Sequence, residues 1–119
     1  MHEASIAQAV LETALAALKD KAPSHSFRIT KIVLVAGVLA GVERECLKTF
    51  FDIISEGTAA AGAEIELRPE PAKLICRQCG HQTLHDSARH VEANCPKCGG
   101  QNKLEGGSAL YVESIEAQE

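Results

Sequence analysis

Four of the five cysteines stand as two Cys-x-x-Cys pairs, and this pattern constrains the fold more than any other feature of the chain. The pairs are Cys76 with Cys79 and Cys95 with Cys98, and fifteen residues separate them. This spacing is typical of a tetrahedral zinc site. Four thiolates leave no open position for water, so we expect a structural zinc. Iron in the same sulfur tetrahedron and a thioredoxin-like redox pair are the alternatives.

Outside the cysteine region, apolar periodicity predicts two helices and three strands. One helix opens the chain and ends near residues 19–22, and a second is predicted over 43–56. The apolar face of this second helix consists of Leu47, Phe50, Phe51 and Ile54. Strands are predicted over 28–38, 63–68 and 109–116. The first strand has a continuous apolar half, which is typical of a strand covered on both faces.

These elements predict an α+β fold, in which a small open-faced sheet with two helices carries an inserted zinc-ribbon-like module. Pro69 and Pro71 are expected to end the second strand and to form a stiff linker into the module. The last strand follows the cysteines and needs a sheet to join, so the simplest topology returns it to the first domain. The expected domains are therefore 1–70 with 108–119, and a zinc-binding domain over 71–107.

Charge and hydropathy exclude several classes of function. Twelve Lys and Arg against sixteen Asp and Glu give a net charge of -4, which disfavours nucleic acids and acidic membranes as partners. The longest apolar run, 32–39, is far shorter than the about 20 residues of a membrane-spanning helix. The opening residues lack the features of a secretory signal, so we expect a cytoplasmic protein with reduced thiols.

An enzymatic function has no support in the sequence. The expected zinc has no free coordination position, and Cys46 has no activating neighbour in the sequence. We expect Cys46 to be buried as a small apolar residue. His81, His85 and His90 lie between the cysteine pairs, where they could compete for metal or simply be solvated loop side chains.

The first residues offer a second kind of metal site. The Met1 amine, the backbone nitrogen of His2 and the His2 imidazole can close two fused chelate rings around one ion. A planar set of nitrogen donors suits Ni(II) or Cu(II). Glu3 could add its backbone nitrogen or its carboxylate. A solvated terminus without metal is the alternative, because a histidine at position two is by itself a weak signal.

Several segments together resemble the HypA/HybF family of hydrogenase nickel-incorporation proteins. They are MHE at 1–3, VLVAGVLAGVE at 33–43, EGT at 56–58, AGAEIEL at 61–67 and the two cysteine pairs. The resemblance covers essentially the whole chain. It implies a nickel metallochaperone that works with a nickel-handling GTPase to load the precursor of the [NiFe]-hydrogenase large subunit.

The resemblance also implies the positions of both metal sites. Nickel, the transient cargo, would bind the Met1 amine, His2 and Glu3, and Zn(II) would bind Cys76, Cys79, Cys95 and Cys98. Glu43 is a lesser candidate for nickel. Family members often have Glu where this chain has Val38. The absence of that carboxylate favours a nitrogen-rich nickel site at the terminus. The alternative function is a zinc-ribbon interaction or regulatory module without nickel.

Overall fold

The computed structural model describes residues 2–21, 27–85 and 92–119. In chain order the elements are α1 (Glu3–Lys21), β1 (Arg28–Gly37), α2 (Arg44–Ile54), β2 (Glu64–Glu70), β3 (Ala72–Cys76), β4 (Gln82–His85), β5 (Asn102–Gly106) and β6 (Leu110–Gln118). They form two compact units. The first contains the chain up to Val35, Val42–Arg68 and Tyr111–Glu119, and the second contains Ala36–Gly41 and Pro69–Leu110.

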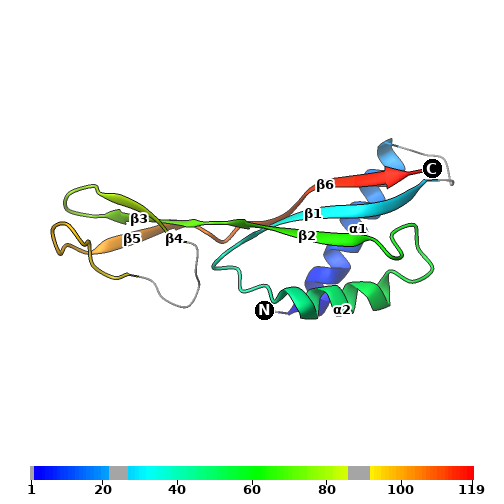
Figure 1. Ribbon diagram of the computed structural model, residues 1–119, viewed down its shortest axis with the longest axis horizontal. Helices are drawn as coiled ribbons and strands as arrows, with labels where there is room; N and C mark the ends of the chain where they lie inside the picture. The colour runs from blue at the N-terminus through cyan, green and yellow to red at the C-terminus, as the bar shows by residue number, and fades with distance from the viewer. Residues whose placement is uncertain (1, 22–26, 86–91) are drawn as a thin grey trace. The chain divides into compact units, whose positions relative to one another are not determined.

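The first unit is a three-stranded sheet with two helices. Its strand order is β2-β1-β6, and the three strands lie side by side in Figure 1. The central strand β1 is buried without interruption from Ile32 onward, which confirms a strand covered on both faces. The helices α1 and α2 pack on each other and complete the core with Val10, Leu11 and Phe51.

The last strand returns to the first sheet, as the sequence predicts. β6 lies beside β1, and the Thr30 hydroxyl donates to the Glu116 carbonyl at 3.2 Å. Arg68 of β2 pairs with Glu113 of β6, so an ion pair links the two outer strands of the sheet. The predicted α+β fold with an inserted module is confirmed.

The second unit is built on a separate antiparallel sheet of order β4-β3-β5. Leu74 in the middle strand lies opposite Thr83 of β4 and Leu104 of β5. Among the described residues of the second unit, the buried apolar side chains are alanines, cysteines and one larger residue, Leu74. This unit therefore has little hydrophobic core of its own.

The expectation that Pro69 ends the second strand is wrong. β2 continues through Pro69 to Glu70, and β3 begins at Ala72, so Pro71 alone separates the two strands. A proline lacks the N–H group that a central strand needs, but β2 is an edge strand of its sheet. One side of β2 has no neighbouring strand, so a proline whose nitrogen faces that side costs no hydrogen bond between strands.

Phe50 also departs from the prediction. Leu47 and Phe51 are buried and Ile54 is half-buried, whereas Phe50 is 41% exposed.

Among the described residues, no helix is long and apolar enough to cross a membrane.

Two backbone segments of the second unit approach each other at Gly37 and Gly107. The Gly37 amide donates to the Ala109 carbonyl at 2.7 Å, and the Leu39 amide donates to the Gly107 carbonyl at 2.7 Å. The Gly107 amide donates to a Glu70 carboxylate oxygen at 2.8 Å. A side-chain Cβ at Gly37 would lie 2.1 Å from the Gly107 oxygen, so the contact requires glycine.

We therefore predict that Gly37→Ala destabilises the zinc-loaded protein by about 3 kcal/mol, because the backbone segments must separate to accept the methyl group. Urea unfolding measures this. Gly41→Ala is the matched control: a Cβ there meets nothing within 4 Å, and its positive φ of 70° should cost only about 1 kcal/mol. Equal losses in the two variants would contradict the close-contact explanation.

Candidate metal sites

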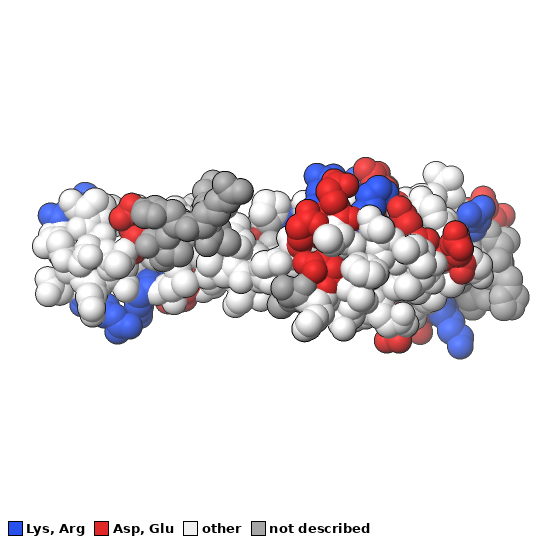
Figure 2. All heavy atoms as spheres, turned by 90° about the horizontal axis from the view of Figure 1, so that it is seen from below, with Lys and Arg blue, Asp and Glu red and all other residues white. Residues whose placement is uncertain are grey.

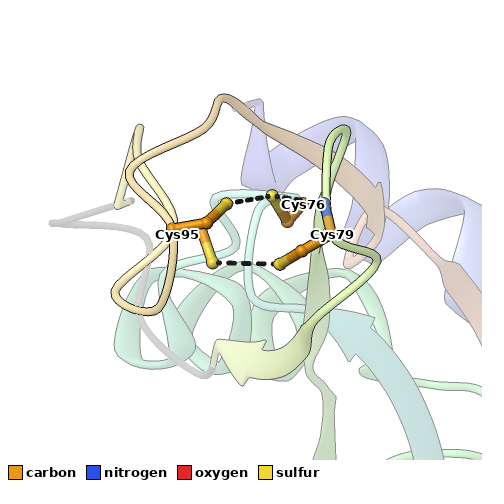
Figure 3. A group of neighbouring side chains, drawn as sticks. Cys76, Cys79 and Cys95 are labelled. Atoms are coloured by element: carbon orange, nitrogen blue, oxygen red, sulfur yellow. Dashed lines mark hydrogen bonds between the residues drawn. The ribbon is translucent and has the colours of Figure 1, made fainter.

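The four paired cysteines converge on one point. Cys76 ends β3, Cys79 lies in the following turn, and Cys95 and Cys98 occupy a second turn. Their sulfur atoms all lie within 4.8 Å of one another. The Cys76 and Cys98 sulfurs are 3.3 Å apart, and those of Cys79 and Cys95 are 3.7 Å apart. Figure 3 shows the labelled side chains pointing toward one another. A zinc–sulfur bond of about 2.3 Å gives a tetrahedron with edges of about 3.8 Å, so the cluster fits zinc.

The two cysteine turns repeat the same backbone design. The Gly80 amide donates to the Cys76 carbonyl at 3.1 Å, and the Gly99 amide donates to the Cys95 carbonyl at 2.9 Å. Both glycines have a positive φ, 77° and 76°, which a residue with a Cβ adopts only with strain. The sequence thus places glycine directly after the second ligand of each pair, where the chain must turn away.

Backbone amides point at the sulfur atoms. The Cys76 sulfur accepts from the amides of Cys79 and Gln78, each at 3.4 Å. The Cys95 sulfur accepts from the Lys97 amide at 3.3 Å, and the Cys98 sulfur from the Gly100 amide at 3.4 Å. Such outer contacts orient metal ligands and favour their ionised form.

The cluster needs a cation to ionise completely. The Cys79 amide lowers the pKa of the Cys76 thiol to about 6, against the opposing effect of burial. At Cys98 the Gly100 amide lowers the pKa, but the neighbouring sulfurs of Cys76 and Cys79 outweigh it and raise the pKa to about 12. One thiol thus ionises readily while another keeps its proton. A divalent ion bound to the sulfurs would offset the repulsion between neighbouring thiolates. With four sulfur ligands, the role of such an ion is structural.

The histidines between the cysteine pairs do not join this cluster in the part of the chain that the structure describes. His81 and His85 are half-buried, and the metal-ligating group within 4.8 Å consists of the four cysteines alone among the described residues. His90 lies outside the described residues.

At the other predicted site, the structure brings Glu3 and Glu43 together. A Glu3 carboxylate oxygen accepts from the Glu43 amide at 3.0 Å, and this hydrogen bond lowers the pKa of Glu3. Glu43 is itself the N-cap of α2, where its carboxylate accepts from the amides of Glu45 at 3.3 Å and Cys46 at 2.7 Å. His2 is exposed, and Met1 lies outside the described residues.

The contact between Glu3 and Glu43 spans forty residues of sequence and was not predicted as a hydrogen bond. The helical pattern over 43–56 places Glu43 at the start of the helix, where an acidic side chain favours the helix dipole. The pattern reveals neither that Glu43 caps α2 nor which residue accepts a hydrogen bond from the Glu43 amide.

The expected burial of Cys46 is wrong, because Cys46 is exposed. It precedes the buried Leu47 by one residue, and one residue turns a helix by about 100°, which carries its side chain away from the core. The Glu43 carboxylate beside it raises the pKa of the Cys46 thiol.

We predict that Cys95→Ser loses most of the bound zinc and the order of β3–β5, because metal binding supplies folding free energy to a unit with little core. Elemental analysis gives the zinc content, and amide hydrogen exchange gives the order. Cys46→Ser is the matched control and should retain one zinc per chain. Full zinc content and unchanged exchange in Cys95→Ser would contradict the structural role.

Comparison with known proteins gives a consistent match along the chain. Residues 1–117 match the family model described as hydrogenase/urease nickel incorporation, metallochaperone, hypA. The hydrogenase maturation factor HypA of Dehalococcoides mccartyi is 38% identical over 120 residues, covering 100% of this chain and 96% of that protein. That of Caldanaerobacter subterraneus is 36% identical, covering 99% of this chain and 100% of that protein.

Solved structures support the fold. The solution structure of the Ni metallochaperone HypA from Helicobacter pylori matches with a TM-score of 0.60 at 19% identity, covering 98% of this chain and 97% of that one. With the family model and both relatives, this places the chain in the HypA family of hydrogenase and urease nickel-incorporation metallochaperones.

Proposed function

We propose that this chain binds Ni(II) at its N-terminus and, together with a nickel-handling GTPase, delivers it for maturation of [NiFe]-hydrogenase. The observation that carries the proposal is the exposed His2 beside Glu3, whose carboxylate is hydrogen-bonded to the start of α2. The family match, which includes these first residues, supports the same assignment.

Nitrogen atoms are the donors that we propose for nickel. The Glu3 carboxylate already accepts the Glu43 amide, so the backbone nitrogen of Glu3 is the donor proposed for this residue. Glu3 is the first residue of α1, and the first amides of a helix have no intrahelical acceptor. Replacing that amide proton with nickel therefore breaks no helical hydrogen bond. The Met1 amine and the two nitrogens of His2 complete a planar set that suits Ni(II).

The charge distribution favours a cation in the unit that contains the terminus. This first unit has twelve Asp and Glu against seven Lys and Arg, a net charge of -5. The second unit has four acidic against five basic residues, a net charge of +1 without its cysteine cluster. An acidic field raises the local concentration of divalent cations.

The two metals have different tasks in this proposal. Domain 1–70 with 108–119 would carry nickel, and domain 71–107 would hold zinc permanently. A terminus can exchange ligands without unfolding a domain, whereas four thiolates in a folded unit cannot. The chain is then a carrier and not an enzyme, since its zinc has no open position and nickel is cargo.

The proposed partners are the nickel-handling GTPase and the precursor of the hydrogenase large subunit. We place this exchange in the cytoplasm, where the cysteines stay reduced. With a net charge of -4, neither nucleic acid nor an acidic membrane is an expected partner.

We predict that His2→Ala lowers nickel affinity by roughly 100-fold, because it removes the imidazole and one chelate ring. Calorimetric titration of the zinc-loaded protein measures the affinity, and zinc content should not change. His81→Ala is the matched control and should bind nickel as the parent chain does. Loss of zinc in His2→Ala would contradict the separation of the two sites.

A second version, with two residues added before Met1, tests the amine itself. The extension moves the α-amino group away and should weaken nickel binding as strongly as His2→Ala. If the extended chain and His2→Ala both bind nickel as the parent chain does, the terminus is not the site. A zinc-ribbon interaction or regulatory module without nickel then becomes the better account.

A further inference from the structure

Helix α2 has two apolar faces, and only one of them is buried. Leu47 and Phe51 point into the core with exposed fractions of 1% and 0%. Cys46, Phe50 and Ile53 are exposed, and the last two retain 41% and 63% of their surface. These three residues, here called the α2 stripe, follow the i, i+4, i+7 spacing of one helix face.

An aligned stripe differs from scattered exposed residues. Single apolar residues on a surface are normal and need no explanation. The α2 stripe instead places an aromatic ring between two further apolar side chains, in a chain with only four aromatic residues. Contiguous apolar surface with an aromatic anchor is typical of a protein-binding site. Figure 2, which views the molecule from below, on the side of α2, shows an uncharged area with both acidic and basic side chains around it.

The charge along its border indicates the kind of occupant. Glu45 and Asp52 are exposed and lie, by helical geometry, along one side of the α2 stripe, and the exposed Glu56 follows shortly after the end of α2. Asp52 has Lys48 at 3.7 Å, an exposed ion pair of little strength. The complementary surface is apolar with Lys or Arg at its edge. A second copy of this chain would place acidic borders together, within units that each carry a net charge of -5.

The α2 stripe begins beside the terminus. Its first residue, Cys46, donates its amide to the Glu43 carboxylate at 2.7 Å, and the Glu43 amide donates to Glu3 at 3.0 Å. A protein bound along the stripe would thus have its edge close to residues 2 and 3. Transfer of a metal between proteins requires donor atoms of both to reach one ion, so this placement matters.

We infer that the α2 stripe is the docking surface for the nickel-handling GTPase, which binds it through an apolar patch edged by Lys or Arg. This inference rests on the proposed function, and it assigns a surface of this chain to the transfer partner. Phe50 is the anchor, and the acidic border orients the partner toward the terminus.

The double variant Phe50→Ser/Ile53→Ser tests the inference with the purified GTPase of the same organism. We expect its dissociation constant for the GTPase to rise at least about tenfold, because the anchor is lost. Nickel titration, zinc content and melting temperature should match the parent chain, since both side chains are exposed. Tyr111→Ser, which removes an aromatic side chain that is 53% exposed on β6, is the matched control and should bind the GTPase normally.

A second variant, Glu45→Lys/Glu56→Lys, tests the border. It should slow association with the GTPase, and the difference in association rate from the parent chain should shrink as salt is added.

If Phe50→Ser/Ile53→Ser melts at a lower temperature than the parent chain, Ile53→Ser alone replaces it, because Ile53 is the most exposed residue of the stripe.

The inference is overturned if the parent chain and Phe50→Ser/Ile53→Ser show the same affinity for the GTPase, or if neither binds it. It is also overturned if sedimentation shows a dimer of the parent chain that the double variant abolishes, because a second copy would then cover the stripe. Equal affinities or a dimer would leave the proposed function standing, because nickel binding at the terminus is measured separately. A parent chain that binds no GTPase would also contradict delivery together with that GTPase, but not nickel binding itself. Failure of the parent chain to bind nickel would contradict the proposed function instead.

Discussion

Four cysteine sulfurs lie within 4.8 Å of one another, and the repulsion that their thiolates would have without a cation is the constraint on which the second unit depends. Its buried apolar side chains are mostly alanine and cysteine, with Leu74 as the larger exception, so hydrophobic burial contributes little. A low pKa at Cys76 beside a high one at Cys98 means that the thiols cannot all ionise without a cation. Zinc converts that repulsion into attraction, and the sheet β4-β3-β5 gains its cohesion from the ion.

Under the proposed function the first unit has the opposite requirement, because it would have to remain folded while nickel binds and leaves. Its core includes Ile32, Leu34 and Phe51, each almost fully buried, and none of them lies among the first residues of the chain. Binding or loss of nickel at the proposed terminal site would therefore not involve these core residues. The connection to the core is the hydrogen bond between Glu3 and the Glu43 amide, which ties the end of the chain to α2.

Patterns set by local chemistry could be predicted from the sequence. The zinc ligands follow from cysteine spacing, and β1 follows from a continuous apolar run. Features that depend on distant neighbours were missed. Pro69 is tolerated because β2 is an edge strand. Phe50 is exposed because Leu47 and Phe51 occupy the positions of α2 that face the core. Periodicity identifies apolar residues on a helix, but it does not show which of two adjacent faces the core has room to cover.

The contact between Glu3 and Glu43 also limits how acid could release nickel from the proposed site. The Glu43 amide lowers the pKa of Glu3 below its ordinary value of 4.5. A carboxylate with a depressed pKa keeps its contact above that ordinary value and loses it as the pH falls through the lowered one. Above pH 4.5 the terminus therefore stays bound to α2, so any release of nickel from the proposed site by mild acid would not come from loss of this contact.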